Sequence, residues 1–93
     1  MRLDKYLKVS RVIKRRTVAK EICDAGRIMV NGHVAKAGHE LKIGDILDIA
    51  MGSRRFKIKV VLIKETVRAN EADTLYEVLE DVRIQPERTE DLL

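Results

Sequence analysis

The pair Asn31-Gly32 is the sequence feature that most constrains the fold of this 93-residue chain. It stands between two short segments of β-type residues, 27–30 and 33–36. A two-residue hairpin loop needs positive φ at both of its positions, and Asn followed by Gly meets that need best. The pair therefore predicts an antiparallel hairpin in the first half of the chain.

The apolar residues of the first quarter are spaced as in helices rather than strands. Leu3, Tyr6 and Leu7 follow the i, i+3, i+4 spacing of a short amphipathic helix. A second helix is predicted with Thr17 as its N-cap and Gly26 as its C-terminal stop. The residues of this second helix that are expected to face inward are Val18, Ala19, Ile22 and Cys23.

Three further strands are predicted after the hairpin. Turns at 44–45 and 52–53 separate a strand over 46–50 from a run over 54–63, and a last strand is predicted over 75–79. The run alternates apolar residues with lysines, and its expected inward residues are Phe56, Ile58, Val60 and Leu62. The elements together predict an α+β fold, with two short helices packed on a small, curved, mainly antiparallel sheet.

The length of the chain predicts one domain, because 93 residues can bury one modest core and not two. We expect this domain to span residues 1–83, with a motif core over 1–50 and additional strands over 51–83. Residues 84–93 are acidic and contain the only proline. They are therefore expected to form a poorly ordered tail.

Charge is strongly segregated along the chain. Residues 1–20 contain eight Lys or Arg and one acid, a net charge of +7, whereas residues 65–93 have a net charge of -6. One carboxylate cannot balance eight cations, so a polyanionic partner explains this end of the chain better than a solvated face does. The cationic residues are Arg2, Lys5, Lys8, Arg11, Lys14, Arg15, Arg16 and Lys20.

The arrangement of these cations favours structured nucleic acid. Arg2, Lys5 and Lys8 recur every three residues on one helical face, and the start of the second helix offers free N–H groups to an anion. The chain has only three aromatic residues, which is too few for a platform on which single-stranded bases stack. Recognition of the backbone of structured RNA or duplex DNA is predicted, and composition does not separate these two.

The residues predict no catalytic site, no metal site and no cofactor. His33, His39 and Cys23 do not match a structural zinc spacing, and no glycine-rich phosphate loop is present. A single cysteine excludes an intrachain disulfide, and together with the absence of a signal sequence it favours a cytoplasmic location. No apolar run is long enough to span a bilayer, and too few anchoring aromatics are present for binding to a membrane surface.

Three stretches of the first half resemble the alpha-L RNA-binding fold, also called the S-four domain. They are MRLDKYL, RRTVAKEICDAGRIMVNG and LKIGDILDI, and the resemblance covers about residues 1 to 50. It implies that Asp4 orients basic side chains and that Leu3, Leu7, Ala19 and Ile22 are core residues. The implied RNA-binding residues are Arg2, Lys5, Lys8, Arg11, Arg15, Arg16, Thr17 and Lys20, to which the charge pattern adds Lys14.

The whole chain is similar to the stand-alone RqcP group of this family and to the related heat-shock S-four protein. The resemblance implies a ribosome-associated protein that binds large ribosomal subunits carrying peptidyl-tRNA, and we expect the chain to be a monomer. It also implies contacts with large-subunit rRNA and tRNA, and support of C-terminal alanine tailing by the factor RqcH. Two alternatives remain: a ribosome assembly or other structured-RNA-binding protein, and a protein-interaction adaptor that uses the acidic C-terminal half.

Overall fold

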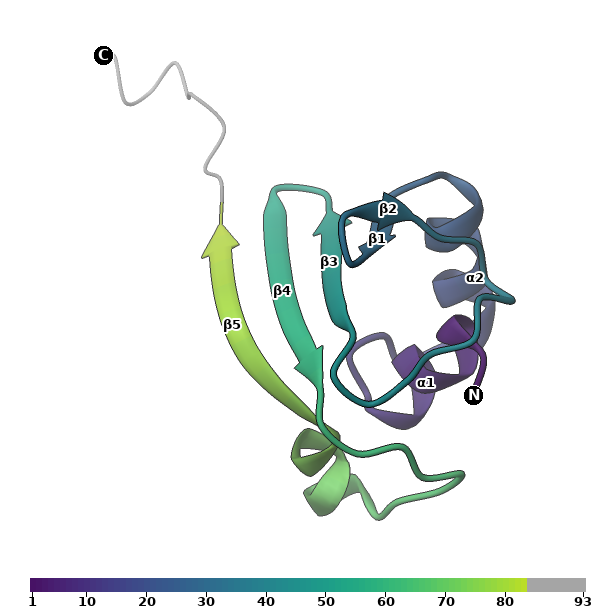
Figure 1. Cartoon of the computed structure of the whole chain (residues 1–93), viewed down its shortest axis with the longest axis vertical. Coiled ribbons are helices and arrows are strands. Elements are labelled where there is room, and N and C mark those ends of the chain that lie inside the picture. The colour runs from purple at the N-terminus through teal and green to yellow at the C-terminus, as the bar shows by residue number, and fades with distance from the viewer. Residues whose placement is uncertain (84–93) are drawn as a thin grey trace.

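The computed structural model describes residues 1–83, so the predicted tail at 84–93 lies outside the described residues. Two helices lie on a five-stranded antiparallel sheet of order β2-β1-β3-β4-β5 (Figure 1). The elements are α1 (Leu3–Val9), α2 (Arg16–Asp24), β1 (Ile28–Val30), β2 (His33–Val34), β3 (Ile46–Met51), β4 (Arg54–Val60), the 3-10 helix η1 (Ala69–Leu75) and β5 (Tyr76–Arg83). The predicted α+β architecture is confirmed.

The β1–β2 hairpin forms at the predicted pair. Asn31 and Gly32 have φ of 53° and 85°, and Val30 lies opposite His33 across the turn. The Asn31 side chain adds a second link, because its amide donates to Asp45 (3.1 Å) and its carbonyl accepts from the N–H of Ile46 (2.9 Å). The hairpin is therefore fastened to β3. Its second strand is only two residues long, shorter than the predicted 33–36.

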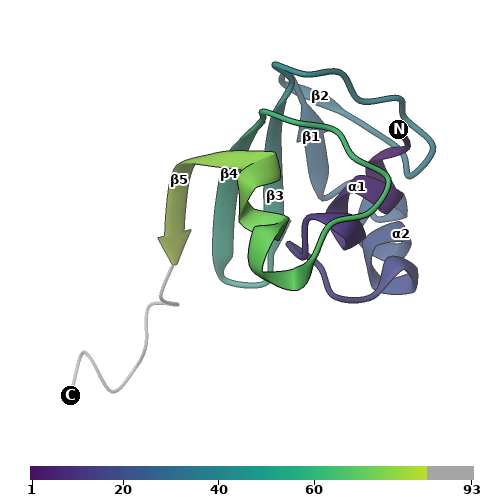
Figure 2. The same cartoon turned by 90° about the horizontal axis from the view of Figure 1, so that it is seen from below.

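The core lies between the two helices and one face of β1, β3 and β4 (Figure 2). The helical stripe of Leu3, Tyr6 and Leu7 is fully buried, as the spacing predicts. The sheet contributes alternate residues of each strand, and the fully buried ones are Ile28, Leu47, Ile49, Ile58 and Val60. Full burial of an aliphatic side chain of this size stabilises a fold by about 1.5 to 3 kcal/mol, so this cluster is the main stabilising element.

The start of α2 differs from the prediction. The helix begins at Arg16 with Arg15 as N-cap, and no side chain caps it, so Thr17 is a residue of the first turn and not the cap. On the inward face of this helix, Ala19 and Cys23 are fully buried, whereas Val18 is 37% exposed. The predicted inward position of Val18 is wrong. Successive residues of a helix are rotated by about 100°, so Val18 lies to one side of the narrow buried stripe formed by Ala19 and Cys23.

The chain after β4 also departs from the prediction. β4 ends at Val60, and the N–H groups of Val61 and Leu62 both donate to the carbonyl oxygen of Leu75, at 2.9 and 3.0 Å. This turns the backbone out of the strand, so Leu62 is 38% exposed and not an inward strand residue. The 3-10 helix that ends at Leu75 was not predicted, and β5 runs over 76–83 rather than 75–79.

Candidate nucleic-acid interface

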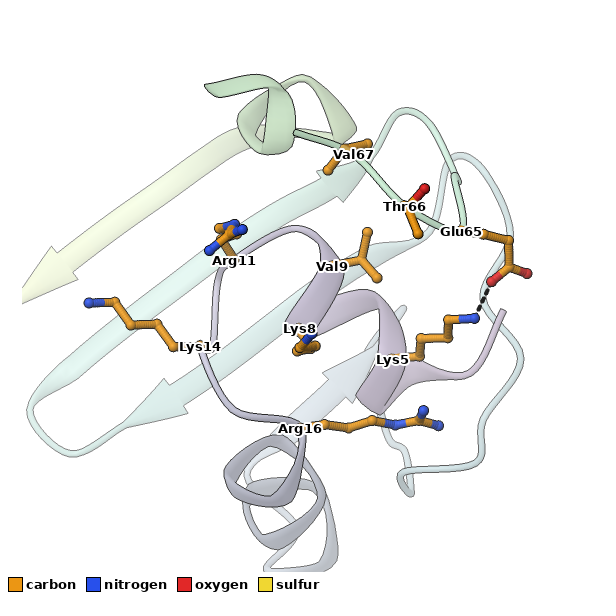
Figure 3. A pocket seen from close by; sticks show the side chains of 9 residues that line it. All are labelled: Lys5, Lys8, Val9, Arg11, Lys14, Arg16, Glu65, Thr66 and Val67. Atoms are coloured by element: carbon orange, nitrogen blue, oxygen red, sulfur yellow. Dashed lines mark hydrogen bonds and ion pairs between the residues drawn. The ribbon is translucent and has the colours of Figure 1, made fainter. Parts of the chain in front are cut away.

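A groove of about 560 Å³ lies between α1 with its link to α2 on one side and the loop 61–68 on the other (Figure 3). Five of the side chains that line it are cationic, and one is a carboxylate. We call it the basic groove. Its lining residues are Lys5, Lys8, Val9, Arg11, Lys14, Arg16, Glu65, Thr66 and Val67.

The structure brings five of the nine sequence-predicted site residues together in the basic groove. These are Lys5, Lys8, Arg11, Lys14 and Arg16. Arg2 precedes α1 and lies beside the groove, where it shares a carboxylate partner with Arg16. Arg15, Thr17 and Lys20 are exposed at and beyond the start of α2 and do not line the groove. The predicted set is thus divided into a groove cluster and a group on α2.

Asp4 orients the two arginines at the edge of the groove. Its side chain is 4% exposed and accepts hydrogen bonds from Nε of Arg2 (3.2 Å), from Nε of Arg16 (3.3 Å) and from the backbone N–H of Lys5 (2.8 Å). Burial raises the pKa of the Asp4 carboxyl, but the bonds from Arg16 and Arg2 outweigh it, so its pKa lies below the ordinary value. The expected role of Asp4 as a partner of basic side chains is confirmed.

The two guanidinium groups keep part of their surface available to a ligand. The side chains of Arg2 and Arg16 are 49% and 45% exposed, although both are held by Asp4. A planar guanidinium has five N–H donors, so one edge can bind a carboxylate while other donors face outward. An anion placed at this edge of the groove would meet pre-oriented donors.

The opposite wall of the groove comes from the loop 61–68, and no local pattern of residues predicts this position. Glu65 accepts a hydrogen bond from Lys5, 60 residues away in the sequence. This bond and the Lys5 charge lower the pKa of the Glu65 carboxyl. Val67 is partly buried against the core, which fixes the far end of the loop. The C-terminal half of the chain therefore contributes to the basic groove.

The N-terminus of α2 lies next to the groove, because Arg16 belongs to both. Among residues 1–83, no side chain caps this helix end, so the N–H groups of its first turn have no capping partner there. An uncapped helix N-terminus carries a partial positive charge and favours anions. The helix end adds to the positive potential that the five groove cations create.

The remaining reactive side chains have ordinary structural surroundings. His33 and His39 are exposed, and Cys23 is fully buried, which together with nearby Asp4 and Asp24 raises the pKa of its thiol to about 11. Among residues 1–83, no three His, Cys, Asp or Glu side chains gather as metal ligands could. Over the same range, no helix has the length and apolarity to cross a membrane.

A small α+β domain whose two N-terminal helices present an arginine pair and a basic groove is an RNA-binding domain of the S-four type. The chain belongs to this S4 domain family, which matches residues 1–47. Within the family it is 62% identical to an "RQC P-site tRNA stabilizing factor" of Halalkalibacterium halodurans, over 84% of this chain and 89% of that protein. It is 48% identical to a protein of the same name in Streptococcus pneumoniae, over 91% and 97% of the two chains.

A solved structure shares the fold of most of the chain. The trimeric structure of heat shock protein 15 of Vibrio cholerae superposes with a TM-score of 0.78 at 32% sequence identity. The match covers 84% of this chain and 80% of that protein. The similarity to both the RQC factors and the heat-shock protein, expected from the sequence, is confirmed.

Proposed function

We propose that this chain is a non-enzymatic RNA-binding factor of ribosome quality control. It binds large ribosomal subunits that carry peptidyl-tRNA, contacts both large-subunit rRNA and the tRNA, and supports C-terminal alanine tailing of the nascent chain by RqcH. The names of its relatives support the P-site tRNA as one ligand. The basic groove supports RNA phosphates as the chemical groups that are bound.

The observation that carries the proposal is the Arg2–Asp4–Arg16 cluster at the edge of the basic groove. A buried carboxylate fixes two partly exposed guanidinium groups, and five cations line the adjacent groove. Phosphate contacts position a protein on RNA, and Arg is suited to them because its fork binds two phosphate oxygens at once. A fixed pair of arginines loses little conformational entropy on binding.

The proposed surface includes all nine residues predicted from the sequence in two parts, the groove cluster together with the adjacent Arg2 and a group of three at the start of α2. The groove cluster would neutralise phosphates of one RNA segment. The second part would contact a neighbouring phosphate through the exposed start of α2, and it consists of Arg15, Thr17 and Lys20. Two contact regions on one small domain are consistent with simultaneous contacts to rRNA and tRNA.

Sedimentation of cell lysate on a sucrose gradient tests this function. The wild-type chain is expected to migrate with free large subunits at low salt and to be released at high salt. The double variant Arg2→Ala/Arg16→Ala should stay at the top of the gradient. The matched control Arg55→Ala/Lys59→Ala removes two cations from the opposite face of β4 and should migrate as wild type does.

The tRNA content of the same fractions separates the proposed function from subunit assembly. A quality-control factor should be found with large subunits that retain peptidyl-tRNA. Association with immature subunits that lack a nascent chain would favour an assembly factor. Absence from all large-subunit fractions at low salt would contradict the proposed function and favour an adaptor that binds protein through the acidic C-terminal half.

A further inference from the structure

Two residues other than glycine have a left-handed backbone in the described part of the chain: Arg11 with φ of 62° and Asn31 with φ of 53°. This conformation is unfavourable for residues with a Cβ atom, and Asn tolerates it better than most. Asn31 also uses its side chain to hold Asp45 and Ile46, as described above. The conformation of Asn31 therefore has a structural reason.

Arg11 stands where helix-ending turns usually have glycine. Ser10 is the C-cap of α1, and the next residue must be left-handed for the chain to close the helix and turn back. The closing bonds run from the N–H of Arg11 to the oxygen of Lys8 (3.0 Å) and from the N–H of Ile13 to the oxygen of Leu7 (3.1 Å). Glycine would form this turn without the steric cost that an arginine side chain brings.

Within residues 1–83, the side chain of Arg11 makes no hydrogen bond or ion pair that would offset the steric cost of its backbone conformation. Among residues 1–83, the ion pairs of the basic groove are those of Lys5 with Glu65 and of Arg16 with Asp4, and none involves Arg11. Arg11 instead lies exposed on the groove, across from the loop that carries Val67 (Figure 3). Unfavourable backbone conformations of this kind concentrate at functional sites.

We propose that Arg11 contacts RNA phosphate and that the chain keeps it in a left-handed conformation at a cost in fold stability. The inference rests on the proposed function, because RNA is the ligand that the groove binds. It deepens that function by identifying a residue at which stability and binding conflict. Replacement of Arg11 by glycine should therefore raise the stability of the fold while it lowers the affinity for RNA, which replacement of the other groove cations should not do.

Three substitutions at one position separate the backbone from the charge. Arg11→Gly relieves the backbone and removes the charge, Arg11→Ala removes only the charge, and Arg11→Lys retains both charge and strain. The control Lys59→Ala removes a cation from the sheet face opposite the helices. Each purified full-length variant is assayed for its melting temperature and for its affinity for purified tRNA at low salt.

Arg11→Gly is expected to melt about 2 to 5 °C above wild type, since relief of strain exceeds the added flexibility of the unfolded chain. Its affinity for tRNA should fall about 5- to 30-fold. Arg11→Ala should bind as weakly as Arg11→Gly without the gain in melting temperature. Arg11→Lys should melt as wild type does and bind with an affinity between wild type and Arg11→Ala, and Lys59→Ala should bind as wild type does.

Two results would overturn the inference alone. One is wild-type affinity of Arg11→Gly for tRNA, which would show that the guanidinium makes no contact. The other is a melting temperature of Arg11→Gly at or below that of wild type, which would show that the left-handed arginine carries no cost. A wild-type chain that fails to bind tRNA at low salt would instead overturn the proposed function, and the inference with it.

Discussion

Arg16 and Asp4 are joined across twelve residues of sequence: Nε of Arg16 donates to Oδ2 of Asp4 over 3.3 Å. The bond ties the first turn of α2 to the first turn of α1 at a carboxylate that is almost completely buried. Arg2 donates to the same carboxylate from the other side. One buried acid thus links the two helices and also orients two partly exposed cations of the candidate interface.

Asp4→Asn should destabilise the fold by about 1 to 2 kcal/mol at neutral pH, because the charged acceptor of two guanidinium groups is lost. The pKa of Asp4 is lowered in the folded chain, so its stabilisation is complete above the unfolded value of about 4 and is lost as the pH falls through the folded value. Urea unfolding at a series of pH values from neutral to acid measures the free energy of unfolding of both chains. If the wild-type chain remains more stable than Asp4→Asn by the same amount at acid pH, this would contradict an ionised Asp4 in the folded chain.

Arg16→Ala should weaken tRNA binding about 5- to 30-fold, because it removes one oriented charge from the groove. It should also lower the melting temperature slightly, since Asp4 keeps only Arg2 as its side-chain partner. Arg16→Lys should recover part of the affinity, because a lysine retains the charge and loses the bidentate fork. Fluorescence anisotropy with labelled tRNA measures the series. Equal binding by wild type and Arg16→Ala would remove Arg16 from the site.

Glu65→Gln should strengthen tRNA binding about two- to five-fold at low salt, because it removes the carboxylate that lines the groove and frees Lys5 from its partner. The melting temperature should not change, since an exposed ion pair adds little stability. Glu71→Gln is the matched control, as this exposed carboxylate in η1 does not line the groove. An equal increase in tRNA affinity in Glu65→Gln and Glu71→Gln would show a general effect of net charge and no local role of Glu65.

Tyr6→Phe should destabilise the fold by about 1 kcal/mol. The buried hydroxyl of Tyr6 donates to the carbonyl oxygen of Leu75 at 2.6 Å, the same oxygen that accepts from Val61 and Leu62. The lost bond therefore loosens the link between α1 and the loop that forms the second groove wall. Chemical denaturation gives the free energy of unfolding, and unchanged stability would show that the remaining donors satisfy this carbonyl.

The parts of the fold with local signals could be predicted from the sequence. The stripe of Leu3, Tyr6 and Leu7 defines α1, and Asn31-Gly32 defines the hairpin, because in each case neighbouring residues carry the whole signal. The 3-10 helix over 69–75 has no such signal. Its last residue, Leu75, is held by bonds from residues distant in the sequence that converge on its carbonyl oxygen, which is a tertiary effect.

The same distinction applies to the candidate site. The cations of residues 1–20 were visible as a cluster of charge, and five of them meet in one groove. The loop that faces them could not be predicted, because Glu65 reaches Lys5 only through the folding of the whole sheet. The conformation of Arg11 could not be predicted either, because a lone arginine in a basic link does not indicate a left-handed backbone.

The dependence of tRNA affinity on salt tests most directly the central claim that the cations in and beside the basic groove neutralise RNA phosphates. If about five phosphates are neutralised, the logarithm of the affinity should fall against the logarithm of salt concentration with a slope of about -3 to -5. Arg2→Ala/Arg16→Ala should make this slope shallower by about 2, whereas Arg55→Ala/Lys59→Ala should leave it unchanged. A wild-type slope near zero, or equal slopes for the two double variants, would contradict the account.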